Sequence, residues 1–583
     1  MTSEIKLQDA FKGYTRDQDK LRPPEETVRE LKARLGRLDL EILDHTVRID
    51  NGRLDIPVFF SYCGRDAAAL TGTKKQMGKG ATPEQAEASA VMELAERFSF
   101  FSFANSPANF VVASRRELAD RTIPFETIAA SVHDSSPDLA AAQELFESLP
   151  LQWARAFNLT RGETVLIPFD WFYAINAFNG PSAGNCVEEA LCQGICEIVE
   201  RHTSSIVSHK RLNCPAINPD SVTDPLTREM LGKYRRAGIR LHITDFTLGM
   251  GIPTVAVLAY DPATFPAESE IVWTAGTTPD PQKALSRALT EVAQLAGDFN
   301  SSTRYVASGL PKFTRLEDAA FVIQPAKIIE LSDLPNISAE NIRIEVERCI
   351  AALCAHNLEV IAVDTTHPRL GVPAFYTIVP GAHFRERASN TGVGLFSAKL
   401  LVEKHGPARA VRELERFEKR LPGKYYTSFY RGTCHLTLKD PQTALRHFRQ
   451  ALERQPTRQD TAAIYSYMGI AYKDMEEYRQ ALSVLAEGQK HDPERTDIYN
   501  LMGFCHFKLK AHREAIACFE KVIALNPSSA IDYANIASNY RDLGETETAV
   551  RYYLMALEID PSIAFARENL AHLAQGLIDP ARA

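Results

Sequence analysis

The last third of the chain contains an internal repeat, and this repeat limits the possible folds more than any other feature of the sequence. Pro493, Pro527 and Pro561 follow one another at intervals of 34 residues, and Pro456 precedes them after a gap three residues longer. Small and aromatic residues recur ahead of each proline, and in the third unit they are Gly503, Ala515 and Phe519. A period of this length is typical of stacked helix pairs that bury a common core.

The spacing and the small residues resemble the tetratricopeptide repeat. The resemblance implies that residues 399–583 form an all-α superhelix of about four repeats, with "SIAFARENLAHLAQGL" as a capping helix. Such arrays present a concave groove to a protein or peptide. We therefore expect this region to bind a protein partner and to carry no chemistry.

The first 398 residues have a different pattern. Short runs rich in Val, Ile, Phe and Tyr, such as "IPTVAVLAY" and "VPAFYTIVPG", alternate with amphipathic helical stretches. The helices are expected at residues 25–35, 83–101, 187–204, 281–296 and 339–355. This alternation predicts an α+β, or mixed α/β, domain of the kind that carries catalytic sites.

Three of these helices carry a polar stripe on one face. The first stripe is Ser89, Glu93 and Glu96, and the third is Arg287, Glu291 and Gln294, both spaced 0, +4, +7. The second stripe runs over four turns and consists of Asn185, Glu189, Gln193, Glu197 and Glu200. Residues at these spacings share a helix face. Such a face is most often exposed to solvent, and this alternative stays open at this point.

Two of the stripes contain a pair of glutamates close together on the helix, within the motif "ExxER". The pairs are Glu93 with Glu96 and Glu197 with Glu200, and like charges at this spacing repel each other. Mg²⁺ prefers carboxylate, water and phosphate oxygens as ligands. Two facing pairs would hold Mg²⁺ ions that also bridge a polyphosphate, and the metal would offset the repulsion.

Two common nucleotide-binding signatures are missing from the sequence. The chain lacks the GxxxxGK[ST] sequence and the kinase motifs. The stretch "MGKGAT" precedes the first striped helix, and either a tight turn or a nucleotide-adjacent loop is consistent with it.

The segments "GKGATPEQAEASAVMELAERFS", "NCVEEALCQGICEIVERH" and "GTTPDPQKALSRALTEVAQ" together resemble the nucleotide-binding segments of the YcaO family, in the same order. The resemblance covers roughly residues 20–395. It implies a YcaO-type enzyme that binds ATP and Mg²⁺ and phosphorylates the oxygen of a peptide backbone amide, as cyclodehydratases and thioamide-forming enzymes do.

Site residues are carried over from the same resemblance. The nucleotide site would consist of Lys20, Ser89, Glu93, Glu96, Asn185, Glu189, Gln193, Glu197, Glu200, Arg287 and Glu291. Glu93, Glu96, Glu197 and Glu200 would be the metal ligands, and Arg287, Glu291 and Glu189 the catalytic residues. Arg287 would neutralise charge on the transferring phosphoryl group. Thr27 and Gln294 are weaker members of the set, and Arg97 and Arg201 are expected to form structural ion pairs.

Three functions remain open. The first is thioamidation, or a related backbone modification, of a peptide or protein substrate, with a TfuA-like protein supplying sulfur. The second is an accessory role in methylthiolation of a small-subunit ribosomal protein. The third is a non-catalytic ATP-binding scaffold that acts through its repeats.

Composition excludes several classes of protein. The net charge is −8, which gives no basic surface for nucleic acid. The polar N-terminus has no apolar segment for a signal peptide or membrane anchor. Ten cysteines without regular spacing do not indicate a disulfide framework. We expect a cytoplasmic protein, and the family resemblance implies a homodimer.

Overall fold

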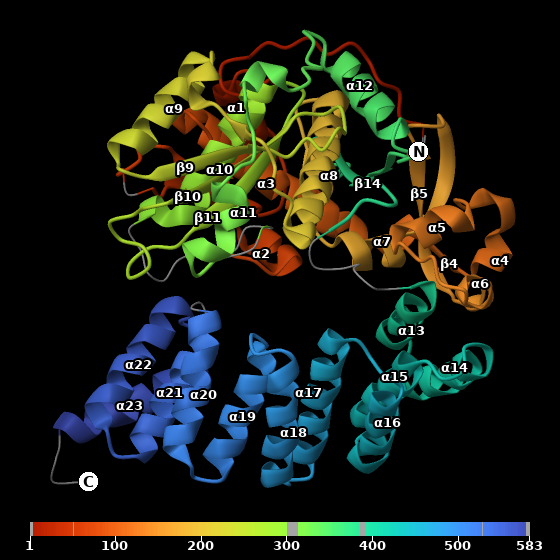
Figure 1. The fold of residues 1–583 in the computed structure, drawn as a ribbon, viewed down its shortest axis with the longest axis vertical. Helices are drawn as coiled ribbons and strands as arrows, with labels where there is room; N and C mark the ends of the chain where they lie inside the picture. The colour runs from red at the N-terminus through yellow and green to blue at the C-terminus, as the bar shows by residue number, and fades with distance from the viewer. Residues whose placement is uncertain are drawn as a thin grey trace. The chain divides into compact units, whose positions relative to one another are not determined.

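A computed structural model describes residues 4–50, 52–299, 310, 313–384, 392–526 and 529–578. The chain divides into two compact units (Figure 1). One unit comprises Met1–Leu139 with Glu147–Val393, and the other comprises Ala140–Phe146 with Gly394–Ala583. We retain the division into domains at residues 1–398 and 399–583 as a proposal. No helix in the described ranges has the length and apolar character needed to cross a membrane.

The first unit contains three β-sheets and is mixed α/β, as the sequence predicts. A three-stranded antiparallel sheet has the order β1-β2-β3, with strands Leu43–Arg48, Val58–Cys63 and Lys75–Lys79. A five-stranded sheet has the order β11-β10-β9-β8-β12, with strands Val272–Thr277, Thr254–Tyr260, Arg240–Asp245, Ala216–Ile217 and Ile328–Ile329. The third sheet has the order β4-β5-β13-β14-β7, and β6 also pairs with β5; its strands are Phe110–Ala113, Leu151–Asn158, Ile361–Asp364, Ala374–Ile378, Pro181–Ala183 and Glu163–Pro168.

Five helices of this unit correspond to those expected from the sequence. They are α1 (Pro24–Leu35), α3 (Pro83–Ala104), α8 (Val187–Lys210), α10 (Pro281–Ala296) and α12 (Ile342–Cys354). The start of α3 is capped by Thr82, whose hydroxyl accepts the Gln85 N–H at 3.2 Å, and Pro83 occupies the first helical position. The other α-helices assigned to this unit are α2 (Arg65–Thr71), α4 (Arg115–Leu118), α5 (Phe125–Ser131), α7 (Phe169–Asn176), α9 (Pro225–Arg236) and α11 (Ala320–Ile323).

The apolar faces of the striped helices form the core. On α3, Val91, Leu94, Ala95 and Phe98 are all buried, as their spacing predicts. On α10, Leu285, Leu289 and Val292 pack in a cluster with residues of the five-stranded sheet. Each helix is thus anchored by one face, which leaves its polar stripe on another side.

Strand β3 lies directly against α3. A Cβ atom on Gly78 would collide with the main chain of Ala90, so only glycine allows this approach. The contact places the side chains at the end of β3 beside the polar stripe of α3.

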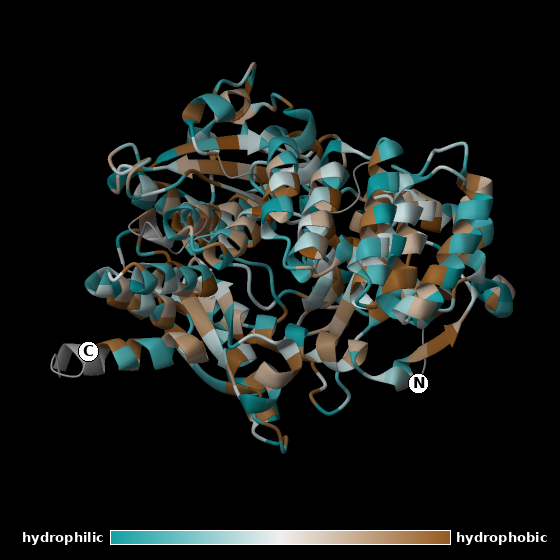
Figure 2. Ribbon diagram, turned by 90° about the horizontal axis from the view of Figure 1, so that it is seen from below, coloured by the Kyte–Doolittle hydropathy of each residue, from teal (hydrophilic) through white to brown (hydrophobic). Residues whose placement is uncertain are grey.

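The second unit is helical and is built of tetratricopeptide repeats. Its consecutive pairs are α15 with α16, α17 with α18, α19 with α20 and α21 with α22. In order, they span Tyr425–Thr437, Pro441–Glu453, Arg458–Asp474, Tyr478–His491, Thr496–Lys508, His512–Leu525, Ala530–Asp542 and Thr546–Ile559. Figure 2 shows hydrophobic and hydrophilic residues side by side along such helices, as expected of helices that bury one face.

These four pairs match the four predicted repeats, and α23 (Ala564–Ile578) packs on α22 where the capping helix is expected. Pro527, one of the repeat-ending prolines, lies outside the described residues. Helices α13 (Val393–Lys404) and α14 (Pro407–Arg420) precede the first pair, and α14 packs on α15. The predicted array is therefore extended by a helix that the proline pattern does not reveal. Helix α6 (Leu139–Ser148) contributes Ala140–Phe146 to this unit.

Candidate functional site

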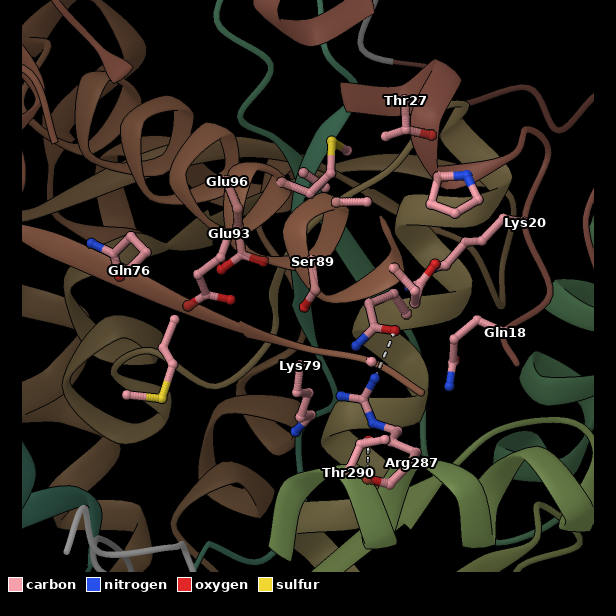
Figure 3. Close-up of a pocket in the computed structure, with 18 of the residues that line it drawn as sticks. Gln18, Lys20, Thr27, Gln76, Lys79, Ser89, Glu93, Glu96, Arg287 and Thr290 are labelled. Atoms are coloured by element: carbon pink, nitrogen blue, oxygen red, sulfur yellow. Dashed lines mark hydrogen bonds between the residues drawn. The ribbon is translucent and has the colours of Figure 1, made fainter. Parts of the chain in front are cut away.

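The polar stripes of α3, α8 and α10 face a common cavity of about 460 Å³ in the first unit. This volume lies within the usual range for small-molecule sites. Ten of the eleven residues predicted for the nucleotide site line it: Lys20, Ser89, Glu93, Glu96, Asn185, Glu189, Gln193, Glu197, Arg287 and Glu291. Thr27 and Gln294 line it as well. Figure 3 shows Ser89, Glu93 and Arg287 projecting into this space.

Glu200 is the exception. It is buried, it does not line the cavity, and its carboxylate accepts a hydrogen bond from Arg287 Nε at 3.4 Å. Arg287 also donates to the side-chain oxygen of Gln193 at 3.2 Å. In this geometry Glu200 holds the Arg287 side chain by a hydrogen bond. Its predicted role as a metal ligand stays a prediction.

Three of the four glutamates in the two ExxER motifs contact the arginine that ends their own motif, whereas Glu200 contacts Arg287. Arg97 Nη2 lies 2.8 Å from Glu93, and Arg97 Nε lies 3.5 Å from Glu96. Arg201 lies 3.6 Å from Glu197. The expected ion pairs of Arg97 and Arg201 are therefore present, and they offset part of the carboxylate repulsion without a metal.

Two nitrogens of these arginines are buried and have no hydrogen-bond partner in the described part of the chain. They are Arg97 Nη1 and Arg201 Nε. An unpaired buried donor costs free energy unless a bound group satisfies it. Both arginines line the cavity, so an oxygen-rich anion there would supply the missing acceptors.

Two carboxylates in the cavity, those of Glu96 and Glu197, are held in an environment that disfavours their charge. Burial raises the pKa of Glu96 well above its usual range, and the neighbouring Glu93 carboxylate raises it further. Burial also raises the pKa of Glu197. A cation between Glu96 and Glu197 would remove this electrostatic cost.

The donor set fits Mg²⁺ only in part. No group of three or more His, Cys, Asp and Glu residues within the described ranges is arranged to hold a metal ion on its own. Mg²⁺ usually keeps several waters and shares its remaining positions between one or two carboxylates and substrate phosphates. Glu93, Glu96 and Glu197 suit this shared coordination, and phosphate oxygens would complete it.

One end of the cavity is fixed by Glu189. Its carboxylate accepts hydrogen bonds from the main-chain N–H of Leu21 at 3.0 Å and from the Asn185 amide at 3.1 Å, and Lys20 Nζ lies 3.7 Å away. The Asn185 side-chain oxygen in turn accepts a hydrogen bond from the Thr27 hydroxyl at 3.1 Å. These contacts attach the N-terminal segment to the start of α8.

Lys79 is a cavity residue that the sequence analysis missed. It ends β3, its side chain contacts Glu291, and Figure 3 shows it beside Arg287. Burial, followed by the nearby Arg287 charge, lowers the pKa of Lys79 to about 7. The signal for Lys79 was present in "MGKGAT", which was interpreted as a turn or loop rather than as the end of a strand. The cavity is also lined by other residues whose spacing in the sequence does not indicate a binding site, among them Gln18, Arg22, Phe60, Gln76 and Met77.

Comparisons with known proteins agree with this geometry. A family model described as "YcaO cyclodehydratase, ATP- and Mg²⁺-binding" matches residues 77–383. Tetratricopeptide-repeat models match residues 397–458, 496–529 and 533–563.

Several curated proteins resemble this chain, among them the following two. An uncharacterized protein in the tfuA 3′ region of Rhizobium leguminosarum is 25% identical over 330 residues, which is 52% of this chain and 76% of that protein. The ribosomal protein S12 methylthiotransferase accessory factor YcaO of Escherichia coli is 28% identical over 232 residues, which is 38% of each chain.

A solved structure shares the fold of this region. The structure of YcaO from Methanopyrus kandleri, bound with AMPPCP and Mg²⁺, has a TM-score of 0.51 and 24% identity. The match covers 66% of this chain and 98% of that one. At this identity the likeness shows the fold alone.

Proposed function

Because the chain belongs to the YcaO family, an ATP- and Mg²⁺-binding family, we propose that it activates a backbone amide of a peptide or protein by phosphorylating the amide oxygen. The product would be a thioamide or a related backbone modification. The observation that carries the proposal is the convergence of three charged helix faces on one cavity.

The residues of the cavity suit phosphoryl transfer. Bound ATP supplies the phosphoryl group that turns the amide oxygen into a leaving group. Arg287 and Arg201 line the cavity and would present positive charge to the phosphates, and such preorganised charge is the main need of this chemistry. Glu93, Glu96 and Glu197, with Glu200 as the fourth predicted ligand, would hold Mg²⁺. Glu291 holds Lys79, and Glu189 holds the N-terminal segment against the site.

Thioamidation needs a source of sulfur. The Rhizobium relative is encoded next to tfuA, which supports a TfuA-like protein as the sulfur-supplying partner. The repeats would bind the substrate or this partner. We also propose a cytoplasmic homodimer.

Two other functions remain as alternatives. The similarity to the E. coli accessory factor supports a role in methylthiolation of a ribosomal protein, although it covers 38% of each chain. A non-catalytic scaffold is the second alternative. It gives no physical reason to bury repelling glutamates around a cavity, because such burial costs free energy without a ligand.

The proposal is tested with purified full-length protein, ATP, Mg²⁺, sulfide and candidate partner peptides. Phosphate release that depends on the peptide, together with replacement of an amide oxygen by sulfur in the mass spectrum, would support thioamidation. ATP turnover only with a ribosomal partner would favour the accessory role. ATP binding without turnover under any of these conditions would favour the scaffold.

A further inference from the structure

Strand β3 has an edge that no other strand of the described chain covers. The sheet order is β1-β2-β3, so β3 pairs with β2 on one side only. Residues of β3, among them Gln76, Met77 and Lys79, line the cavity. The strand that carries the uncovered edge therefore belongs to the wall of the predicted ATP site.

The ladder shows which main-chain groups this edge presents. The Cys63 N–H donates to the Lys74 carbonyl at 2.9 Å, which makes these two residues a hydrogen-bonded pair. In an antiparallel ladder hydrogen-bonded and non-hydrogen-bonded pairs alternate. Phe60 and Met77 are register partners three positions along the ladder from Cys63 and Lys74. An odd number of steps changes the type of pair, so Phe60 and Met77 form a non-hydrogen-bonded pair. The main-chain N–H and C=O of Met77 thus point away from β2.

The other ladder of the sheet gives the same result for Lys79. The Ile49 N–H donates to the Val58 carbonyl at 2.9 Å, so Val58 directs its main-chain groups toward β1. Its register partner in β3 is Lys79, whose main-chain groups therefore face away from β2. No described residue forms a hydrogen bond with the main chain of Met77 or Lys79 on this edge.

We propose that an extended segment of the acceptor peptide adds to the free edge of β3 as a fourth strand. Main-chain hydrogen bonds at Met77 and Lys79 hold the peptide and place one of its backbone amides in the cavity. This inference rests on the proposed function and states how its substrate is bound.

Strand addition suits the chemistry of the substrate. The reacting group is a backbone amide, which every residue of a peptide carries. Main-chain hydrogen bonds provide affinity that does not depend on side chains. An added strand lies about 4.8 Å from its neighbour, so it would run along the border of the cavity that β3 lines, next to the bound nucleotide.

Lys79 connects the peptide edge to the phosphate-binding residues. Its main chain faces the free edge, whereas its side chain contacts Glu291, a predicted catalytic residue on α10. A peptide paired with this edge would therefore present its amide beside the charged side chains of α10.

A proline substitution tests the edge without breaking the sheet. Proline lacks the N–H group and is tolerated in edge strands where that N–H faces outward. Met77→Pro removes one hydrogen bond to the added strand and leaves the ladder with β2 intact. Arg48→Pro is the matched control. Arg48 pairs with Phe59 on the opposite edge of the sheet, and its N–H faces away from β2 by the same alternation.

The probe is a mixture of eight-residue peptides with randomised side chains. It is titrated against full-length protein loaded with Mg²⁺ and a non-hydrolysable ATP analogue. We expect half-saturation at about tenfold higher peptide concentration for Met77→Pro, which is the effect of one lost main-chain hydrogen bond, and no change for Arg48→Pro. A backbone N-methylated mixture should bind the wild-type protein equally weakly, and this second measurement needs no variant.

Several outcomes would overturn the inference. One is wild-type affinity of Met77→Pro, and another is undiminished binding of the N-methylated mixture. A third is loss of dimers in Met77→Pro with peptide binding retained, which would assign the edge to a second copy of the chain. In each case the wild-type protein still binds the ATP analogue, so the proposed function stands. Failure of the wild-type protein to bind the analogue would instead contradict the proposed function.

Discussion

At the scale of single residues, the cavity combines acidic groups that destabilise the ligand-free protein with arginines that only partly offset them. Glu96 shows this most clearly, since both burial and Glu93 raise its pKa while Arg97 lowers it. The Glu96 carboxylate is therefore expected to lower the stability of the ligand-free protein and to strengthen the binding of Mg²⁺ and ATP.

Glu96→Gln should stabilise the ligand-free protein and weaken binding of Mg²⁺ and ATP. A carboxyl with a raised pKa in the folded state binds more protons than it does in the unfolded state. The free energy of unfolding therefore falls as the pH rises from 4.5, the ordinary pKa of a glutamate, through the raised pKa of Glu96. The variant should lose this part of the pH dependence. The melting temperature at several pH values, with and without Mg²⁺ and ATP, measures both effects.

Glu415→Gln is the control, because Glu415 is exposed and lies on a helix of the second unit. It should leave the pH dependence and the ligand-induced stabilisation unchanged. Equal pH profiles for Glu96→Gln and the wild-type protein would contradict the electrostatic account of the cavity.

At the scale of helices and strands, the repeats depend on close contacts at glycine. A Cβ atom on Gly503 would lie 2.7 Å from the ring of Phe519, across the helix pair α19 and α20. Gly503→Ala should destabilise this pair by about 1–3 kcal/mol, because overpacking forces side chains or backbone to shift. Chemical denaturation followed by circular dichroism measures the loss.

Gly406→Ala serves as the matched substitution. Gly406 precedes α14 with an ordinary backbone conformation, and a Cβ atom there would meet nothing within 4 Å. Gly406 is the N-cap residue of α14, where alanine is less favourable than glycine, so the expected loss of stability is at most about 1 kcal/mol. If both variants unfold like the wild-type protein, the close helix packing is not a source of stability.

The same scale explains what the sequence could predict. Helical spacing is local, so the positions of Glu93, Glu189 and Arg287 on their polar faces follow from residues a few places apart. The fit of glycine and phenylalanine in the repeats is similarly periodic. These features account for the predicted helices and for most of the residues around the cavity.

Other features depend on contacts between distant segments. The pairing of β3 with β2, and its packing on α3 through Gly78, bring Lys79 into the cavity, and no local pattern encodes that approach. The hydrogen bond between Glu200 on α8 and Arg287 on α10 likewise depends on how these two helices pack. Lys20 was predicted from the family resemblance alone. It contacts Glu189, which lies far from it in the sequence.

At the scale of the whole molecule, we expect the first unit to bind Mg²⁺ and ATP and the second unit to bind the protein partner. Deleting residues 400–583 should leave binding of Mg²⁺ and ATP intact, because every cavity residue lies before residue 295. The same deletion should weaken binding of the protein partner. Calorimetry with ATP and a pull-down with the identified partner measure the two effects.

The truncation also removes the partners of α6, since Ala140–Phe146 belong to the unit that contains the repeats. Some loss of thermal stability is therefore expected and does not count against the account. Loss of ATP binding by a truncated protein with intact far-ultraviolet circular dichroism would contradict the proposed division.

The central claim is that the acidic and basic faces of three helices form one site for Mg²⁺ and ATP. Calorimetric titration of full-length protein with ATP, in the presence and absence of Mg²⁺, tests it most directly when wild type is compared with Glu197→Gln. We predict Mg²⁺-dependent binding by the wild-type protein and at least about tenfold weaker binding by Glu197→Gln, a loss of about 1.4 kcal/mol or more. Equal affinity of the two proteins for ATP and Mg²⁺ would contradict the account.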